Sequence, residues 1–199
     1  MSKRIGIFGG SFDPVHLGHK RLAEFMVDAL SLDKLLIIPA ACSPFKDGTS
    51  SSSEHRMNMC RLQFNEDVFE VSDIELLRGG KSYTVDTVNA VKELYPDSKL
   101  FLIIGSDQLM QFHKWYCFDK IMEKAVICAV ARAEKDDISA MEKYTDENLR
   151  QHGECKIFEF NPLQISSTEI RQLIKNGENT DAVLSCEVFE YAKREGLYL

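Results

Sequence analysis

Short apolar runs alternate with helical patterns along this chain, and that alternation restricts the fold more than any other feature of the sequence. Buried strands are predicted over residues 4–8, 34–39, 99–104, 125–131 and 156–160. Because these runs are continuously apolar, each strand is expected to be covered on both faces. Amphipathic helices are predicted between strands, as over residues 17–30 and 85–94. Right-handed crossovers between parallel strands then predict a doubly wound, Rossmann-like α/β fold.

The length of 199 residues predicts a single domain, since domains commonly hold roughly 100 to 200 residues. An exposed, charged helix is predicted over 136–153. Two further helices, 168–176 and 187–195, are predicted in a C-terminal helical part that begins near residue 161. The polar segment 46–53 (KDGTSSSS) cannot bury much area, and its composition fits a lid and a plain connector equally well.

Charge and composition exclude several kinds of partner. The chain has 24 Lys and Arg against 31 Asp and Glu, a net charge of −7, and no basic tract, which argues against binding to nucleic acid or to an anionic membrane. Its apolar runs fall far short of the roughly 20 residues that span a bilayer, and no secretory signal is expected. The six cysteines lack CxxC or zinc-like spacing, as in reduced proteins. We expect a cytoplasmic protein that binds small molecules.

The most informative segment is GGSFDPVHLGH, residues 9–19, which follows the first predicted strand and opens the first helix. In open α/β sheets, ligands bind at this kind of strand-to-helix turn, where free N–H groups favour phosphate. Gly9 and Gly10 allow a ligand to approach the backbone closely. The segment is neither GxGxxG nor a Walker A loop, so an ordinary dinucleotide oxidoreductase and a P-loop NTPase are both disfavoured.

Within that segment, Asp13 is predicted to cap the first helix, with Pro14 at its first position. His16 and His19 are spaced to share one helix face near the positive end of the helix dipole. One histidine near a helix start is usually structural, but two histidines with paired glycines favour an anion site.

A second segment, ISSTEIR over residues 165–171, contains a capping box formed by Ser166 and Glu169. It places the hydroxyls of Ser167 and Thr168, and the guanidinium of Arg171 one turn later, at another helix N-terminus. Taken alone, this pattern is explained by capping. Together with the first segment, it predicts a second set of phosphate ligands.

With these two segments the sequence resembles the nucleotidylyltransferase superfamily, whose HxGH and SSTxxR signatures match residues 16–19 and 166–171. The residues between these signatures, together with the last residues of the sequence, resemble the bacterial nicotinate-nucleotide adenylyltransferases. The matching residues are Ile38-Pro39-Ala40, Ser43-Pro44-Phe45-Lys46, Ser82-Tyr83-Thr84-Val85-Asp86-Thr87, Ile104-Gly105-Ser106-Asp107, His113-Lys114-Trp115 and Gly196-Leu197-Tyr198.

The resemblance implies transfer of the adenylyl group of ATP to nicotinate mononucleotide, giving nicotinate adenine dinucleotide and pyrophosphate in NAD biosynthesis. The mononucleotide phosphate would attack the α-phosphorus in line, without a covalent enzyme intermediate. Mg²⁺ would accompany ATP, held largely by phosphates and water, and we assign no protein ligand to it.

The resemblance also implies roles for particular residues. The implied catalytic residues are His16, His19, Lys46 and Arg171. The implied ATP-binding residues are Gly9, Gly10, Ser11, Phe12, His16, His19, Gly105, Asp107, Ile165, Ser166, Ser167, Thr168 and Arg171. The implied mononucleotide-binding residues are Ser11, Lys46, Tyr83, Thr84, Trp115 and Arg132. Phe45 stands where many members carry histidine, so the charge at that position rests on Lys46. A core role for Trp115 and a solvated charge at Arg132 are the structural alternatives.

Three other functions are left open by the sequence. The acceptor could be nicotinamide mononucleotide or another phosphate ester, since amide and acid differ by one charge. A sensor would bind the dinucleotide without making it, although it would not need the phosphate-binding side chains. A histidine nucleophile has the least support, because nothing in the sequence resembles an orienting base. The sequence does not decide whether the chain forms a homo-oligomer.

Overall fold

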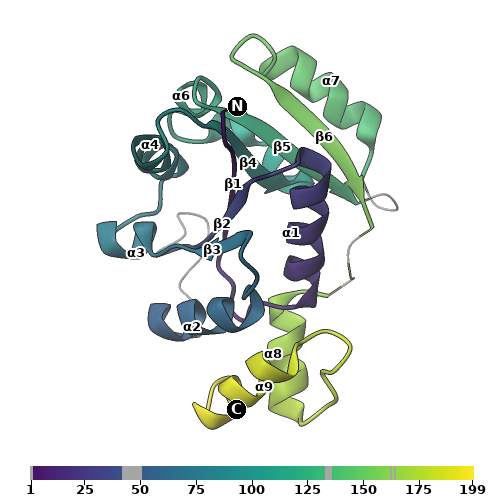
Figure 1. The fold of residues 1–199 in the computed structure, drawn as a ribbon. Coiled ribbons are helices and arrows are strands. Elements are labelled where there is room, and N and C mark those ends of the chain that lie inside the picture. The colour runs from purple at the N-terminus through teal and green to yellow at the C-terminus, as the bar shows by residue number, and fades with distance from the viewer. Residues whose placement is uncertain (1, 42–50, 133–135, 162, 164) are drawn as a thin grey trace.

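The computed structural model describes residues 2–41, 51–132, 136–161, 163 and 165–199. Its centre is a six-stranded sheet in the order β3-β2-β1-β4-β5-β6, and every neighbouring pair is parallel (Figure 1). The strands are β1 (Arg4–Gly10), β2 (Lys34–Pro39), β3 (Phe69–Val71), β4 (Lys99–Gly105), β5 (Ala125–Arg132) and β6 (Cys155–Phe160). The predicted doubly wound parallel sheet is confirmed. The sequence did not reveal β3, because its three residues are too few to show a pattern.

The helices pack around this sheet. They are α1 (Leu17–Leu30), α2 (Ser53–Gln63), α3 (Ile74–Arg78), α4 (Thr84–Leu94), α5 (Ser106–Leu109), the 3-10 helix η1 (Phe112–Lys114), α6 (Phe118–Met122), α7 (Ile138–Asn148), α8 (Ser167–Asn176) and α9 (Cys186–Arg194). The predicted charged helix is shorter than expected, because Asp137 caps α7 at its start and the helix ends at Asn148.

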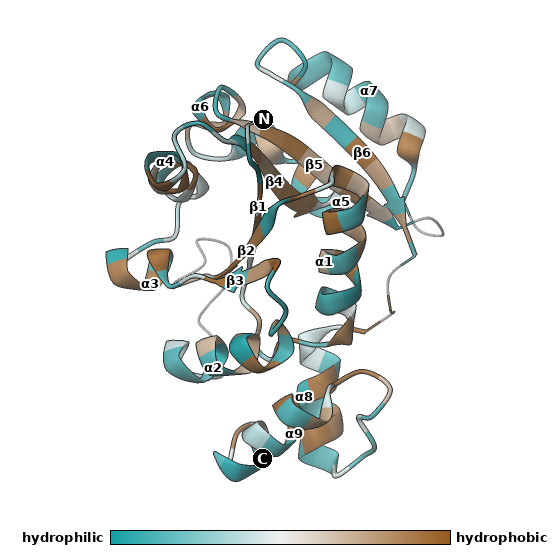
Figure 2. Cartoon of the chain, in the orientation of Figure 1, coloured by the Kyte–Doolittle hydropathy of each residue, from teal (hydrophilic) through white to brown (hydrophobic). Residues whose placement is uncertain are grey.

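Both faces of the sheet are buried, which explains the continuously apolar strands. In β2, Leu35 and Ile37 pack in one core with α1, whereas Leu36 and Ile38 pack in a second core with α4. Figure 2 shows the apolar colouring along β5, whereas β6 carries polar residues among its apolar ones. The two polar residues of β6, Lys156 and Glu159, are exposed, and β6 is an edge strand with only one sheet neighbour.

The strand order reverses between β1 and β4. From β1 the chain adds β2 and β3 on one side, and then β4, β5 and β6 on the other. In such sheets, ligands bind in the crevice outside the carboxyl ends of the strands at the reversal point. The segment 9–19 leaves β1 at that point.

The C-terminal helices lie beside this same end of the sheet (Figure 1). Ile170 of α8 and Val188 of α9 are fully buried in the core that also holds Phe12. The N–H of Leu17 donates to the carbonyl of Val183, at 2.9 Å. These contacts bring the ISSTEIR segment next to the GGSFDPVHLGH segment, about 150 residues earlier. Within the described residues, every helix is too short or too polar to cross a bilayer.

Candidate functional site

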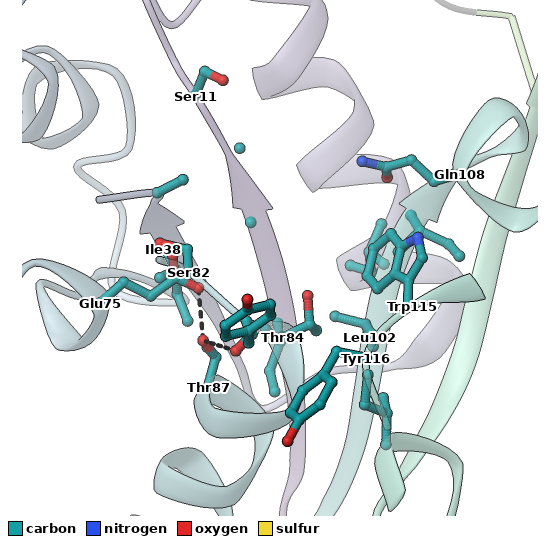
Figure 3. Close-up of a pocket in the computed structure, with 18 of the residues that line it drawn as sticks. Ser11, Ile38, Glu75, Ser82, Thr84, Thr87, Leu102, Gln108, Trp115 and Tyr116 are labelled. Atoms are coloured by element: carbon teal, nitrogen blue, oxygen red, sulfur yellow. Dashed lines mark hydrogen bonds between the residues drawn. The ribbon is translucent and has the colours of Figure 1, made fainter. Parts of the chain in front are cut away.

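A cavity of about 450 Å³ opens at the carboxyl ends of β1, β2 and β4 (Figure 3). This volume is in the range of small-molecule sites. Seven residues implied by the sequence line it: Gly9, Gly10, Ser11, His19, Tyr83, Thr84 and Trp115. Its other lining residues include apolar residues of three strands: Ile7 of β1, Ile38 of β2, and residues 102–104 of β4. The cavity therefore joins the predicted ATP segment to the predicted mononucleotide segment.

The first helix has the expected bounds but a different N-cap. Helix α1 starts at Leu17 with His16 as its N-cap, so the prediction of Asp13 at the N-cap and Pro14 at the first helical position was wrong. The Asp13 carboxylate instead accepts hydrogen bonds from the hydroxyls of Ser51 and Tyr198. Residues 11–15 are consequently a loop that enters α1 from the cavity side.

The two histidines lie against each other. Their ring centroids are 3.7 Å apart, and His19 Nδ1 accepts a hydrogen bond from the backbone N–H of His16 at 3.3 Å. An accepting Nδ1 is unprotonated, so a neutral His19 carries its hydrogen on Nε2. The buried ring of Phe12 meets His19 edge-on, with centroids 5.0 Å apart. His19 is thus held from two sides as a hydrogen-bond donor at the cavity wall.

His16 is almost fully buried, with 6% of its surface exposed. Burial lowers its pKa from 6.5 to about 4, so the ring is neutral at physiological pH. Its Nδ1 has no hydrogen-bond partner among the described residues. A Cβ on Gly18 would lie 3.0 Å from two atoms of this ring, which explains the glycine between the histidines.

The carbonyl groups of the loop between β1 and α1 are held by residues far away in the sequence. Arg56 Nη1 donates to the carbonyl of Ser11 at 2.9 Å, and Arg171 Nη1 donates to that of Asp13 at 2.6 Å. The Ser167 hydroxyl donates to the carbonyl of Pro14 at 2.9 Å. Helices α2 and α8, which are more than 100 residues apart in the sequence, therefore both hold this loop.

Arg56 was not singled out in the sequence, and its side chain is fully buried. Burial lowers its pKa, while the negative charge of Asp13 acts in the opposite direction. A signal was present: Arg56 lies on the same helical face as the buried residues Cys60 and Gln63. An arginine on the buried stripe of a helix usually has a specific partner.

The predicted capping box at α8 is confirmed. Ser166 Oγ accepts from the N–H of Glu169 at 3.2 Å, and the Glu169 carboxylate accepts from the N–H of Ser166 at 2.7 Å. Thr168 is exposed, and its hydroxyl accepts from Arg171 Nη2 at 3.0 Å. Ile165, just before the helix, packs partly against the core. The N-terminus of α8 thus lies against the loop that carries His16, as the two motifs together predicted.

Asp107 and Arg132 form an ion pair of 3.1 Å at the ends of β4 and β5, outside the main cavity. From the sequence, Asp107 was expected to bind ATP and Arg132 was expected to bind the mononucleotide. Asp136 also holds Arg132, and this carboxylate raises the pKa of the guanidinium. Gly105 lies next to this pair without lining the cavity. Lys46 and Phe45 lie outside the described residues.

Three cavity residues were missed by the sequence reading. Gln108 accepts a hydrogen bond from the N–H of Gly105 at 3.2 Å, and the ring of Tyr116 lies 5.0 Å from that of Tyr83. Glu75 is buried and accepts a hydrogen bond from Thr87 at 2.6 Å. No spacing signal marks these residues, because short helices separated by turns bring them to the cavity.

A nucleotide-sized cavity at the strand-order reversal, lined by paired glycines and a histidine, defines a nucleotide-binding α/β protein. A family model described as cytidylyltransferase-like matches residues 7–173. The chain therefore belongs to the cytidylyltransferase-like family.

Within that family, relatives along the whole chain carry one name. The Clostridium tetani protein named "Probable nicotinate-nucleotide adenylyltransferase" is 36% identical, over 98% of this chain and 99% of its own length. The protein of the same name from Carboxydothermus hydrogenoformans is 37% identical over 98% of each chain. These relatives place the chain among the nicotinate-nucleotide adenylyltransferases, which are nucleotidyltransferase enzymes of NAD biosynthesis.

Solved structures share the fold. The Plasmodium falciparum nicotinic acid mononucleotide adenylyltransferase complexed with NaAD superposes with a TM-score of 0.80 at 20% identity, covering 98% of this chain and 97% of that one. The same Plasmodium enzyme complexed with APC gives a TM-score of 0.77 at 19% identity, with the same coverage. At these identities the likeness establishes the fold.

The burial of His16 predicts a measurable pH dependence of stability. Unfolded, its ring binds a proton near pH 6.5, but in the folded chain it does so only near pH 4. Between these values the unfolded state holds more protons, so the free energy of unfolding falls as the pH falls, by about 3 kcal/mol in total from this group. Urea denaturation from pH 7 to pH 4 should show a shallower decline in His16→Asn than in wild type. Parallel declines would contradict the assignment.

Proposed function

We propose that this enzyme transfers the adenylyl group of ATP to nicotinate mononucleotide, forming nicotinate adenine dinucleotide and releasing pyrophosphate. The observation that carries the proposal is the single cavity between the His19 wall and the Tyr83, Thr84 and Trp115 wall. The names of the relatives and the ligands of the Plasmodium structures support it. We also propose that residues 1–199 act as one catalytic unit in the cytoplasm.

On the ATP side, Gly9, Gly10 and Ser11 bring backbone to the edge of the cavity. A Cβ on Gly10 would lie 2.9 Å from the Phe12 ring, so this position cannot carry a side chain without moving the ring. His19 Nε2–H is the donor proposed for an oxygen of the transferring phosphate. The N-terminus of α8, with Ser167, Thr168 and Arg171, is proposed to receive the leaving phosphates.

We propose that Asp107 accepts from the ribose hydroxyls of the adenosine, while its ion pair with Arg132 holds the carboxylate in place. This gives Arg132 a supporting role on the ATP side in place of direct contact with the mononucleotide.

On the mononucleotide side, the N-terminus of α4 faces the cavity at Thr84. Its N-cap, Tyr83, makes no side-chain capping bond, so the positive end of the helix dipole is available to the carboxylate of nicotinate. This effect is worth roughly 0.3–1 kcal/mol, and about 2 kcal/mol where partly buried, which corresponds to a preference of about 2-fold to 30-fold over the neutral amide. Trp115, backed by Phe112 at 5.0 Å, is proposed to stack on the pyridine ring.

Glu75 supports a second candidate acceptor. Its buried carboxylate lines the same cavity, so it could accept a hydrogen bond from the amide of nicotinamide mononucleotide and would repel a nicotinate carboxylate. Arg78 reduces this repulsion, because its guanidinium lies 3.3 Å from the Thr87 hydroxyl that also binds Glu75. We therefore favour the acid as substrate.

The reaction needs positioning and stabilisation of charge more than a covalent partner. The phosphate of the mononucleotide attacks the α-phosphorus of ATP, the bond to the β,γ-pyrophosphate breaks, and the enzyme supplies donors where negative charge grows. The neutral His16 cannot act as a cation, so the positive charge at the site comes from arginine, lysine and helix ends. Mg²⁺ would neutralise the triphosphate when bound. We propose phosphate oxygens and water as its ligands.

The direct test is incubation with ATP, Mg²⁺ and each mononucleotide in turn, followed by identification of the product. We expect nicotinate adenine dinucleotide and pyrophosphate, with higher kcat/KM for the acid. Faster turnover of nicotinamide mononucleotide would show that the amide, and not the acid, is the substrate. Absence of turnover with either mononucleotide would contradict adenylyl transfer to a pyridine nucleotide.

Replacing His19 by alanine should remove the donor to the transferring phosphate. We expect pyrophosphate release to fall about 100-fold to 1,000-fold, with an unchanged circular dichroism spectrum. His152→Ala is the matched control, because that ring packs on Phe118 away from the cavity. Release by His19→Ala at the wild-type rate would show that His19 has no part in the chemistry.

Replacing Trp115 by alanine should weaken binding of the mononucleotide more than binding of ATP. Stacking of a base on an aromatic ring is worth about 1–3 kcal/mol, so the KM for the mononucleotide should rise about 5-fold to 150-fold while that for ATP stays within about 2-fold. Trp115→Phe, which keeps an aromatic face, should recover most of the loss. Equal rises in both constants would instead indicate damage to the packing around Phe112.

A further inference from the structure

The hydroxyl of Tyr198, the next-to-last residue, reaches the loop between β1 and α1. It donates to Asp13 Oδ1 at 2.6 Å and lies 3.1 Å from Ser51 Oγ, which itself donates to Asp13 Oδ1 at 2.5 Å. Tyr198 and Asp13 are 185 positions apart in the chain. The end of the chain is therefore connected to the segment that precedes His16.

The backbone of the tail adopts an unusual conformation to make this contact. Gly196 and Tyr198 have φ angles of 64° and 65°, in the left-handed region. Glycine adopts this region freely, but a bulky side chain is rarely found there unless surrounding contacts determine it. The hydrogen bond to Asp13 is the contact that accompanies this conformation.

Asp13 is held through both its side chain and its backbone. Only 4% of its surface is exposed, and its carbonyl accepts from Arg171. The charge of its carboxylate also acts on the fully buried guanidinium of Arg56, which binds the carbonyl of Ser11. A buried carboxylate is costly without such partners, so removing one partner changes where the carboxylate can sit.

Displacement of Asp13 is transmitted to His16 over a short, packed stretch. The carbonyl of Pro14 accepts from Ser167, and Val15 is fully buried. Neither residue can move independently of its neighbours. Two held residues therefore connect Asp13 to His16, whose ring lies against that of His19.

Building on the proposed function, we propose that Tyr198 and Asp13 are positioning residues for adenylyl transfer. Tyr198 fixes the Asp13 carboxylate, and Asp13 fixes the loop that sets His16 and His19 against the triphosphate. Burial raises the pKa of Tyr198, and the adjacent Asp13 carboxylate raises it further, so the hydroxyl is a donor throughout the neutral range.

Tyr191 provides a matched control within the same C-terminal part. Its hydroxyl accepts from Asn58 Nδ2 at 3.0 Å and lies 2.9 Å from His55 Nδ1, and the residue is buried. Those contacts join α9 to α2 without touching the loop at Asp13. Tyr191→Phe and Tyr198→Phe each remove one hydroxyl that makes partly buried hydrogen bonds, so they differ mainly in what that hydroxyl holds.

The test compares the full-length wild type with Tyr198→Phe and Tyr191→Phe. For Tyr198→Phe we expect kcat to fall about tenfold, because small displacements of reacting groups are costly, while the KM for the mononucleotide stays within about 2-fold. Hydrogen exchange should become faster in a peptide covering residues 11–17. Tyr191→Phe should lower the melting temperature to a similar extent, with wild-type kcat and exchange in that peptide.

A second pair of variants tests Asp13 directly. Asp13→Asn retains an oxygen that can accept from Tyr198, so it should keep more turnover than Asp13→Ala. Wild-type kcat and exchange in Tyr198→Phe, or equal kcat losses in Tyr198→Phe and Tyr191→Phe, would overturn the proposal. Absence of turnover in the wild type would count against the proposed function, and the exchange measurement would still decide whether Tyr198 holds the loop.

Discussion

The loop that joins β1 to α1 depends on hydrogen bonds to its own carbonyl groups, and the rest of the site depends on that loop. Arg56 and Arg171 each donate to one of these carbonyls, from two helices that are far apart in the sequence. Charged donors make stronger bonds than neutral ones, so they can hold a backbone segment that belongs to no helix or strand. The segment around residue 170 thereby becomes part of the same site as the segment around residue 16.

This arrangement assigns the charge of the site to arginines and helix ends and leaves His16 neutral. His16 is buried and its pKa is lowered to about 4, while His19 accepts a backbone hydrogen bond through Nδ1. A neutral imidazole at the cavity wall can donate one directed hydrogen bond to a phosphate oxygen. Positive charge then comes from guanidinium groups such as that of Arg171 and from helix ends.

Much of the fold could be predicted from the sequence, because continuously apolar strands and striped helices are local signals. The ISSTEIR segment could be predicted as a capped helix start for the same reason, and Ser166 and Glu169 pair as expected. The N-cap of α1 could not be predicted, since the Asp13 carboxylate is taken by Tyr198 and Ser51, which are distant in sequence. Likewise, Glu75 and Gln108 reach the cavity through chain turns that carry no spacing pattern.

The most direct measurement is a crystal structure of the wild-type protein with a non-hydrolysable ATP analogue and nicotinate mononucleotide. The account predicts the α-phosphate within hydrogen-bond distance of His19 Nε2, the β- and γ-phosphates at the N-terminus of α8, and the pyridine ring on Trp115. A triphosphate bound away from both His19 and α8, with the loop between β1 and α1 unchanged, would contradict it.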